Sequence, residues 1–181
     1  MSIDETKVTT FATICLVLLR EVRQERGFHQ AQVADWLGKT ASAWTKIEAG
    51  KSPLQFDVFV RVCTSLGLPS SYVMSAAERY ASVLSNNWMG DRYAVLTTEL
   101  DGDDALLRFA QEYWATPGFR LPGNRWGNFQ TILNSPYMDG NGGNINAPVF
   151  EYAINPAFRE QMKNATPIAP SSLPYGGTLS F

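Results

Sequence analysis

Apolar residues recur at helical spacing through the first 86 residues, and glycines that can end a helix separate the apolar stretches. The turn signals include Gly27, Gly38 and Gly50. This pattern predicts five helices, at about 8–26, 30–37, 41–49, 55–66 and 70–85. Residues 14–19 of the first helix are apolar on every side, so we expect two covered faces, packed on the C-terminal region or on a second subunit.

The pattern changes after residue 87, where Gly, Pro, Asn and aromatic residues become frequent. An amphipathic helix is predicted over 101–115, and Asn155 followed by Pro156 is typical of the start of a short helix that reaches Lys163. A hairpin or flexible loop is expected around Asn141 and Gly142, and residues 164–181 suggest an extended tail. Strands are predicted over 93–100, 128–133 and 149–154.

Two domains follow from this change of composition. Residues 1–86 are predicted to form an all-α domain of five helices that includes a linker helix. Residues 87–181 are predicted to form a small α+β domain whose fold stays open. Its expected role is oligomerisation, partner binding or sensing.

The segment 30–50 has the layout of two short helices joined by a tight turn. A helix-turn-helix unit needs this layout because its second helix lies in the major groove of DNA. By helical spacing, Trp44 and Ile47 point inward toward Ala34. Short or positively charged residues fall on the outer side of the second helix: Ala41, Ser42, Thr45 and Lys46.

The stretch 19–68 resembles the Cro and phage-repressor helix-turn-helix family, also called the xenobiotic-response-element family. The shared pattern is Leu-Arg-x-x-Arg at 19–23, Gly-Phe-His-Gln at 27–30, Val-Ala-x-x-Leu-Gly at 33–38 and Trp-x-x-Ile-Glu-x-Gly at 44–50. Several spacings agree together, which a single glycine-centred turn would not do. The resemblance implies a lambda-repressor-like fold for the N-terminal domain and binding to double-stranded DNA.

The resemblance also implies roles for the matching positions. Gln30 would hydrogen-bond a DNA phosphate and brace the recognition helix, and Arg23 and Glu48 would form an internal salt bridge between the first and third helices. The other implied DNA-binding residues lie on or beside the second helix of the motif: Lys39, Thr40, Ala41, Ser42, Thr45, Lys46 and Lys51. Two positions depart from the family, since His29 replaces a Thr, Ser or Asn cap and Trp44 replaces a branched aliphatic residue.

Each of these assignments has a purely structural alternative. The salt bridge would serve the fold whether or not DNA binds. Ser42 and Thr45 could lie on a solvated helix face, and Lys39 and Lys51 could be ordinary surface lysines. For Trp36, burial in the core or between the domains is favoured over a surface contact.

Charge permits DNA binding only through local placement. The formal net charge of the chain is −2. Residues 1–70 hold eight Lys or Arg against seven Asp or Glu, and residues 71–181 hold seven against ten. No overall field therefore attracts nucleic acid, and a few well-placed bases must supply the attraction.

Catalytic and metal chemistry finds little support in the sequence. His29 is the only histidine, and no cysteine follows Cys63, which excludes most zinc sites and serine–histidine triads from residues 70–181. We expect no enzyme activity, no cofactor and no metal. Cys15 and Cys63 are predicted to be buried thiols. The acidic cluster at 99–104 lacks the spacing of a calcium loop and is expected at a helix N-terminus.

The predicted function is sequence-specific transcription regulation, with repression by a homodimer on a pseudo-palindromic operator. The alternative is a protein-binding module, such as an antitoxin or a phage or plasmid accessory protein, whose C-terminal domain holds a partner. A cytoplasmic location without membrane association is expected, because Asp4 and Glu5 stand where a signal peptide needs positive charge.

Overall fold

The structure is a computed structural model that describes residues 7–87, 90–121 and 131–166. Within these residues it holds the helices α1 (Phe11–Glu25), α2 (Gln30–Leu37), α3 (Ala41–Glu48), α4 (Phe56–Ser65), α5 (Ser70–Asn86), α6 (Ala105–Ala115), α7 (Pro148–Ile154) and α8 (Pro156–Lys163). The strands are β1 (Lys7–Thr10), β2 (Tyr93–Leu96), β3 (Tyr137–Met138) and β4 (Asn144–Ile145), and the 3₁₀ helices are η1 (Gly118–Arg120) and η2 (Ile132–Asn134).

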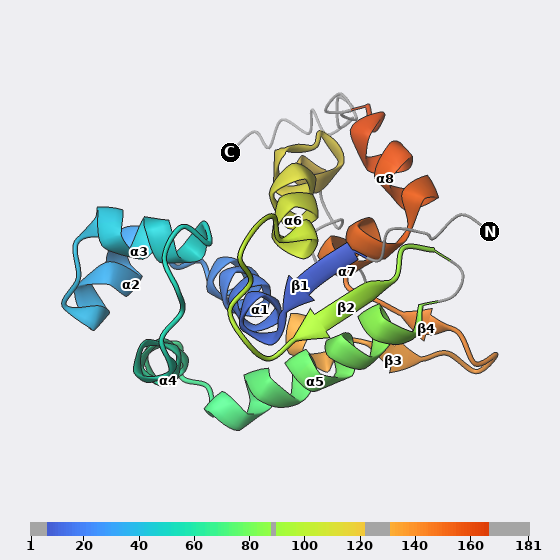
Figure 1. Cartoon of the computed structure of the whole chain (residues 1–181). Helices are drawn as coiled ribbons and strands as arrows, with labels where there is room; N and C mark the ends of the chain where they lie inside the picture. The colour runs from blue at the N-terminus through green and yellow to red at the C-terminus, as the bar shows by residue number, and fades with distance from the viewer. Residues whose placement is uncertain (1–6, 88–89, 122–130, 167–181) are drawn as a thin grey trace, which may run out of the picture.

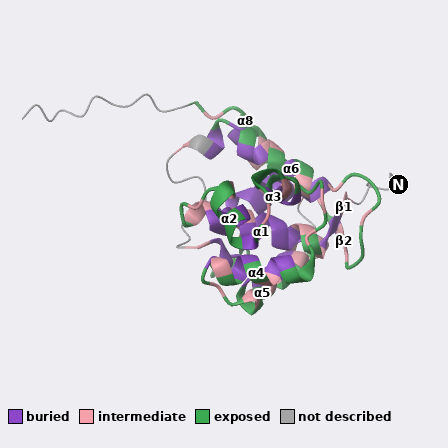
Figure 2. Ribbon diagram, turned by 90° about the vertical axis from the view of Figure 1, so that its left-hand side faces the viewer, coloured by how far each residue is buried: buried purple, intermediate pink, exposed green. Residues whose placement is uncertain are grey.

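Helix α1 lies at the centre of the molecule. All six residues of the segment 14–19 are buried, and α1 packs against α5, α6 and η2 (Figures 1 and 2). The expectation that this stretch packs on the C-terminal region is therefore confirmed. Helices α2, α3 and α4 form a lobe to one side of α1, at the left of Figure 1.

A parallel pair of strands joins the start of the described chain to the segment that follows α5. β1 pairs with β2 in the register Lys7 to Tyr93 and Thr10 to Leu96. The prediction that the first helix begins near residue 8 was wrong at this end, because residues 7–10 are extended. Thr10 caps α1 instead, its Oγ1 accepting a hydrogen bond from the backbone N–H of Thr13 at 3.0 Å.

The predicted strand at 149–154 is wrong, since this segment is helix α7. Its residues are buried on nearly every side, so apolar periodicity could not separate a strand from a helix. Pro148 at the first turn favours the helix, because its fixed φ suits that position. Of the predicted strand at 128–133, residues 128–130 lie outside the described residues, and Ile132 and Leu133 belong to η2.

The hairpin expected around Asn141 and Gly142 is confirmed, because β3 and β4 pair antiparallel on either side of it. Gly142 has a φ of +83°, which glycine adopts without strain. The Asp139 carboxylate accepts the backbone N–H groups of Asn141 and Gly143 at 2.9 and 2.7 Å and closes the turn.

One buried apolar core contains residues from both sides of residue 86, the predicted domain boundary. Tyr80 of α5 stacks on Phe150 of α7 with ring centroids 3.6 Å apart, and the Tyr80 hydroxyl accepts the backbone N–H of Ala147 at 2.9 Å. The predicted N-terminal and C-terminal domains therefore share one core. Cys15 and Cys63 are free and buried, and burial raises the pKa of Cys15 to about 12 and that of Cys63 to about 11.

Candidate nucleic-acid interface

Helices α2 and α3 are joined by a short turn that starts at Gly38. Gly38 adopts a φ of +63°, and the backbone N–H of Lys39 returns to the carbonyl of Ala34 at 2.9 Å to close α2. Thr40 then caps α3, its Oγ1 accepting the N–H of Ala43 at 3.1 Å. The turn at Gly38 was predicted from the sequence and is confirmed.

The inner side of α3 is fixed in the core. Trp44 is 1% exposed, and Ile47 and Glu48 are also buried. Helix α3 packs against α2, whose inner residues Val33 and Ala34 are fully buried. The large indole at position 44 therefore lies inside the helix pair rather than on the reading surface.

The outer side of α3 is open to solvent. Ala41, Ser42, Thr45 and Lys46 are all exposed, as is Thr40. The Thr45 hydroxyl donates to the carbonyl of Ala41 at 2.9 Å. Lys51 in the turn after α3 is exposed, whereas Lys39 and Gln30 are half-buried. These are the side-chain types and the exposure that a helix needs to contact base edges or phosphates.

A buried carboxylate ties α3 to α1 and α2. Glu48 Oε1 accepts from Arg23 Nε at 2.6 Å, and Glu48 Oε2 accepts from Arg23 Nη2 at 3.1 Å. The third guanidinium nitrogen of Arg23 donates to the carbonyl of Phe28 at 2.7 Å. Both side chains are nearly excluded from solvent, at 9% and 1% exposure for Arg23 and Glu48. This bidentate ion pair fixes the C-terminal end of α3 against α1.

Gln30 joins the same network through Glu48, a partner that the resemblance did not specify for the expected bracing of the recognition helix. Its Nε2 donates to Glu48 Oε2, and its Oε1 accepts a long hydrogen bond of 3.4 Å from the Thr45 hydroxyl. Gln30 thus connects the first residue of α2 with the middle and the end of α3. An amide nitrogen has two hydrogens, so this contact leaves one of them for a phosphate.

Two features at the edges of α2 differ from expectation or were missed. Trp36 is 38% exposed and packs edge-on against Phe28 with ring centroids 4.8 Å apart, so the expected burial of Trp36 was wrong. Position 36 lies at the edge of the buried side of the short helix, one turn after Val33 and well away from Ala34. The backbone N–H of His29 is bound by the Gln32 side chain at 2.8 Å, a capping contact that the atypical His29 had obscured.

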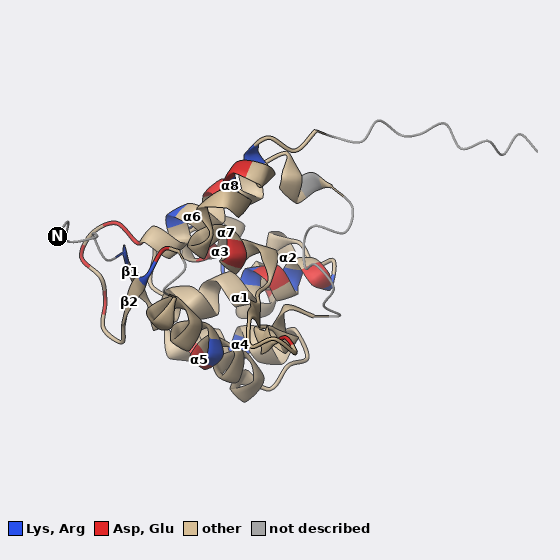
Figure 3. Cartoon of the chain, turned by 90° about the vertical axis from the view of Figure 1, so that its right-hand side faces the viewer, with Lys and Arg blue, Asp and Glu red and all other residues tan. Residues whose placement is uncertain are grey.

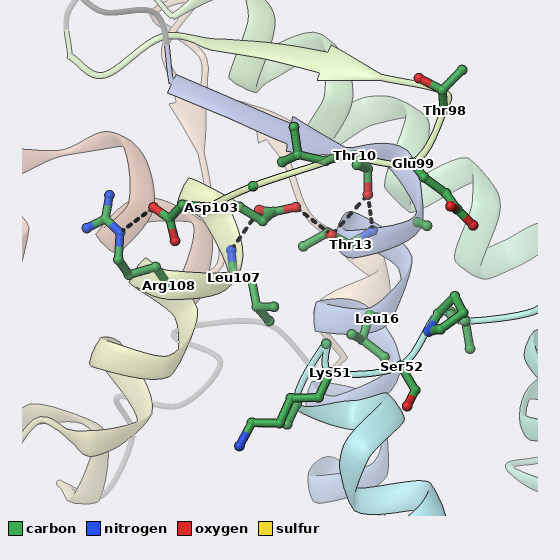
Figure 4. Close-up of a pocket in the computed structure, with 18 of the residues that line it drawn as sticks. Thr10, Thr13, Leu16, Lys51, Ser52, Thr98, Glu99, Asp103, Leu107 and Arg108 are labelled. Atoms are coloured by element: carbon green, nitrogen blue, oxygen red, sulfur yellow. Dashed lines mark hydrogen bonds and ion pairs between the residues drawn. The ribbon is translucent and has the colours of Figure 1, made fainter.

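A cleft lies beside the end of α3. It has a volume of about 750 Å³ and separates the 49–54 turn from the 97–104 loop and α6, with the first turns of α1 as its floor (Figure 4). Lys51 and Ser52 lie on one wall, and Asp103, Leu107 and Arg108 lie on the other. The cleft therefore runs between the candidate DNA-reading lobe and the C-terminal part.

The acidic cluster takes the structural role that was expected for it. Asp104 caps α6 by accepting the N–H of Leu107 at 3.0 Å, and it also accepts the hydroxyls of Thr9 and Thr13 at 2.8 and 2.7 Å. Asp103 pairs with Arg108 at 3.0 Å. Among the described residues, no group of three or more His, Cys, Asp or Glu side chains could hold a metal ion.

Charge on the surface is dispersed. Along the ribbon in Figure 3, Lys and Arg positions are interspersed with Asp and Glu positions. In the segment 30–51, the lysines are Lys39, Lys46 and Lys51, and Glu48 is neutralised by Arg23 in the interior. Asp35 is the remaining acid of this segment, so its surface charge is locally positive in a chain of net charge −2. In the part of the chain that the structure describes, no helix is long and apolar enough to cross a bilayer.

Comparison with known proteins agrees with this geometry. Residues 17–71 match the protein-family model described as a helix-turn-helix domain, a span that runs from α1 through α4 to the first residues of α5. No curated protein and no solved structure matches the chain. The helix-turn-helix domain that the sequence predicted is therefore confirmed, and its membership of the Cro and phage-repressor family in particular stays a prediction.

Proposed function

We propose that this protein is a sequence-specific DNA-binding transcription regulator that reads the major groove with α3. The observation that carries the proposal is the division of α3 into two sides. Trp44, Ile47 and Glu48 are held in the interior, while the small and polar residues Ala41, Ser42, Thr45 and Lys46 face solvent. A helix with a rigid inner side and short outer side chains can approach base edges closely.

Specific residues take specific parts in this proposal. Ala41, Ser42, Thr45 and Lys46 face bases or adjacent phosphates. Gln30, Lys39, Thr40 and Lys51 contact the phosphate backbone on either side, which positions the helix without selecting a sequence. Arg23 and Glu48 hold α3 in place from inside.

The proposal extends to repression by a dimer. Two copies would present their α3 helices to half-sites about 34 Å apart, one turn of DNA, and so read a pseudo-palindromic operator. The C-terminal part would supply contacts between copies, a partner surface or a signal input.

The test is selection of a genomic fragment library by the purified full chain at a physiological ionic strength of about 0.15 M. Enrichment of one motif with two-fold symmetry is the expected result. The absence of any enriched motif would contradict sequence-specific reading and would favour the protein-binding alternative, in which the C-terminal part holds a partner.

Two matched substitutions test whether the DNA-reading surface lies on α3. Thr45 of α3 and Thr64 of α4 are both exposed, and each hydroxyl donates to the carbonyl four residues earlier, at 2.9 and 3.0 Å. Thr45→Glu and Thr64→Glu therefore make the same chemical change on an exposed helix turn, and they differ in that Thr45 also makes the long contact of 3.4 Å with Gln30. We expect Thr45→Glu to abolish selection, because its carboxylate would face DNA, and Thr64→Glu to retain it. Equal behaviour of the two variants would argue against α3 as the reading helix.

Lys46→Ala distinguishes the two kinds of contact. Loss of a phosphate contact would weaken all sequences alike and lower the salt dependence of log K by about 1. Loss of a base contact would relax selection at one position of the motif. Unchanged affinity and unchanged selection would remove Lys46 from the interface.

A further inference from the structure

Helix α6 of the C-terminal part contacts the chain directly after α3. The side-chain Nε2 of Gln111 donates to the carbonyl of Ala49 at 3.2 Å. One turn earlier in α6, Leu107 packs against the backbone of Gly50 so closely that a Cβ at position 50 would overlap Leu107 Cδ2 and lie 3.4 Å from its Cγ. All four of these residues line the cleft between the lobe and the C-terminal part, in which Figure 4 shows Leu107.

Helix α6 is itself fixed to α1 at both ends. At its start, Asp104 accepts the hydroxyls of Thr9 and Thr13, which precede and open α1. Near its end, the indole nitrogen of Trp114 donates to Glu21 at 2.5 Å, and Arg20 lies over the Trp114 ring at 3.6 Å from its centroid. A helix held at two ends against a buried neighbour is a rigid support, since both anchors must break before it moves.

The contacting residues share one side of α6. Positions 107, 111 and 114 follow the i, i+4, i+7 spacing, so the side that meets α1 through Trp114 also meets the turn after α3. On its other side, the end of α3 is held by Arg23 and Gln30 through Glu48. The last turn of α3 therefore lies between a bond to α1 and a contact with α6.

We propose that Leu107 and Gln111 are positioning residues for DNA reading, holding the C-terminal end of α3 at the angle that sequence selection requires. They touch no base. They act by restricting the movement of residues 49–50 and, through these, of α3. This inference rests on the proposed function, and it gives the C-terminal part a direct role in sequence selection by α3.

The closing experiment measures two quantities on the full chain, so that the two proposals can fail separately. The first is the rate of amide hydrogen exchange over residues 46–51, with residues 31–37 of α2 as the internal reference. The second is the ratio of affinities for the selected motif and for unrelated duplex DNA. The variants are Leu107→Ala and Gln111→Met, the latter removing the hydrogen-bond donor at nearly constant size.

We expect faster exchange at 46–51, unchanged exchange at 31–37, and an affinity ratio that falls about five- to tenfold, the scale of one lost hydrogen bond or apolar contact. Leu107→Met should keep the affinity ratio near its wild-type value, because the methionine side chain can fill the contact that Leu107→Ala leaves empty. Gln161→Met, the same change at an exposed position of α8, should alter neither quantity.

A pair of glycines gives an independent check. Gly50 and Gly27 have φ values of +70° and +71°, but nothing lies within 4 Å of a Cβ built at Gly27. Gly50→Ala and Gly27→Ala therefore carry the same backbone strain, and only the first displaces Leu107. We expect Gly50→Ala alone to lower the affinity ratio, and to lose that extra effect when Leu107→Ala is also present.

Unchanged exchange at 46–51 in Leu107→Ala and Gln111→Met would overturn the positioning role. Faster exchange with an unchanged affinity ratio would also overturn it, because α3 would then read DNA equally well when released. If the wild-type chain selects no sequence while exchange responds as expected, the proposed function fails and the support of α3 by α6 stands.

Discussion

Removing Arg23 should be strongly destabilising, because it breaks the buried ion pair that joins α1 to α3. Arg23→Ala deletes the bonds to Glu48 at 2.6 and 3.1 Å and the bond to the Phe28 carbonyl at 2.7 Å. Glu48 is 1% exposed, so its carboxylate would stay buried, with the Gln30 side chain still donating a hydrogen bond to it. The broken hydrogen bonds and the uncompensated Glu48 carboxylate both lie in the protein interior.

The size of the effect follows from this burial. Breaking a buried ion pair by removing one partner costs about 3–5 kcal/mol, mostly because the other charge remains without compensation. For a chain of this length each kcal/mol lowers the melting temperature by about 2–4 °C, so we expect a fall of roughly 6–20 °C. Urea and thermal unfolding followed by circular dichroism would measure it.

Two further variants make the result specific. Lys163→Ala breaks an exposed pair with Glu160 at 3.5 Å and should cost less than about 1 kcal/mol, because exposed pairs contribute little. Arg23→Met combined with Glu48→Leu should recover much of the stability, since apolar residues of similar volume replace both charges. An Arg23→Ala protein that melts within about 2 °C of wild type, less than 1 kcal/mol, would refute the reasoning.

Three other outcomes are expected. Burial raises the pKa of the Glu25 carboxyl above its ordinary value of 4.5, although Thr131 and the N–H of Ile132 donate to it. The contribution of Glu25 to stability is therefore fully present below that ordinary value and is lost as pH rises through the folded-state pKa. Glu25→Gln should flatten this part of the stability curve in urea titrations from pH 4 to 8, and parallel curves for the variant and the wild type would contradict it. Burial opposes ionisation of Asp91, but its bonds to Lys7 and Arg159 at 2.6 and 2.5 Å prevail and lower its pKa below 3.8. Asp91→Asn should therefore cost about 1–3 kcal/mol near neutral pH and progressively less as acid protonates the wild-type carboxylate, whereas a cost independent of pH would exclude this charge effect. Trp36→Ala should lower stability far less than Trp44→Ala, for which about 3–5 kcal/mol is expected, because Trp36 is 38% exposed and Trp44 only 1%; equal losses in thermal unfolding would contradict the burial argument.

The N-terminal helices were predictable because their signals are local. Gly38 ends α2 and Thr40 starts α3 through contacts that span three to five residues, so the sequence carries the information within one turn. The inward direction of Trp44 and Ile47 follows from helical spacing alone. The partial exposure of Trp36 could not be predicted in the same way, because apolar character alone does not tell which side of a short helix is covered by another element.

The C-terminal part and the support of α3 depend on contacts between distant residues. β1 pairs with β2 across more than 80 residues, and neither four-residue strand signals its partner. The apolar run that forms α7 is buried on nearly every side, so periodicity could not choose between helix and strand.

The sequence by itself determined where the helix-turn-helix begins and ends and which side of α3 faces outward. These features depend on backbone propensity, capping and helical spacing, which act over a few residues, whereas the pairing of Arg23 with Glu48 was implied only by the family resemblance. Only the tertiary structure decided that Gln30 joins the Glu48 network and that Leu107 and Gln111 reach the turn after α3. Those contacts exist because α1 packs against both parts of the chain, and packing between segments far apart in sequence leaves no periodic signal in either segment.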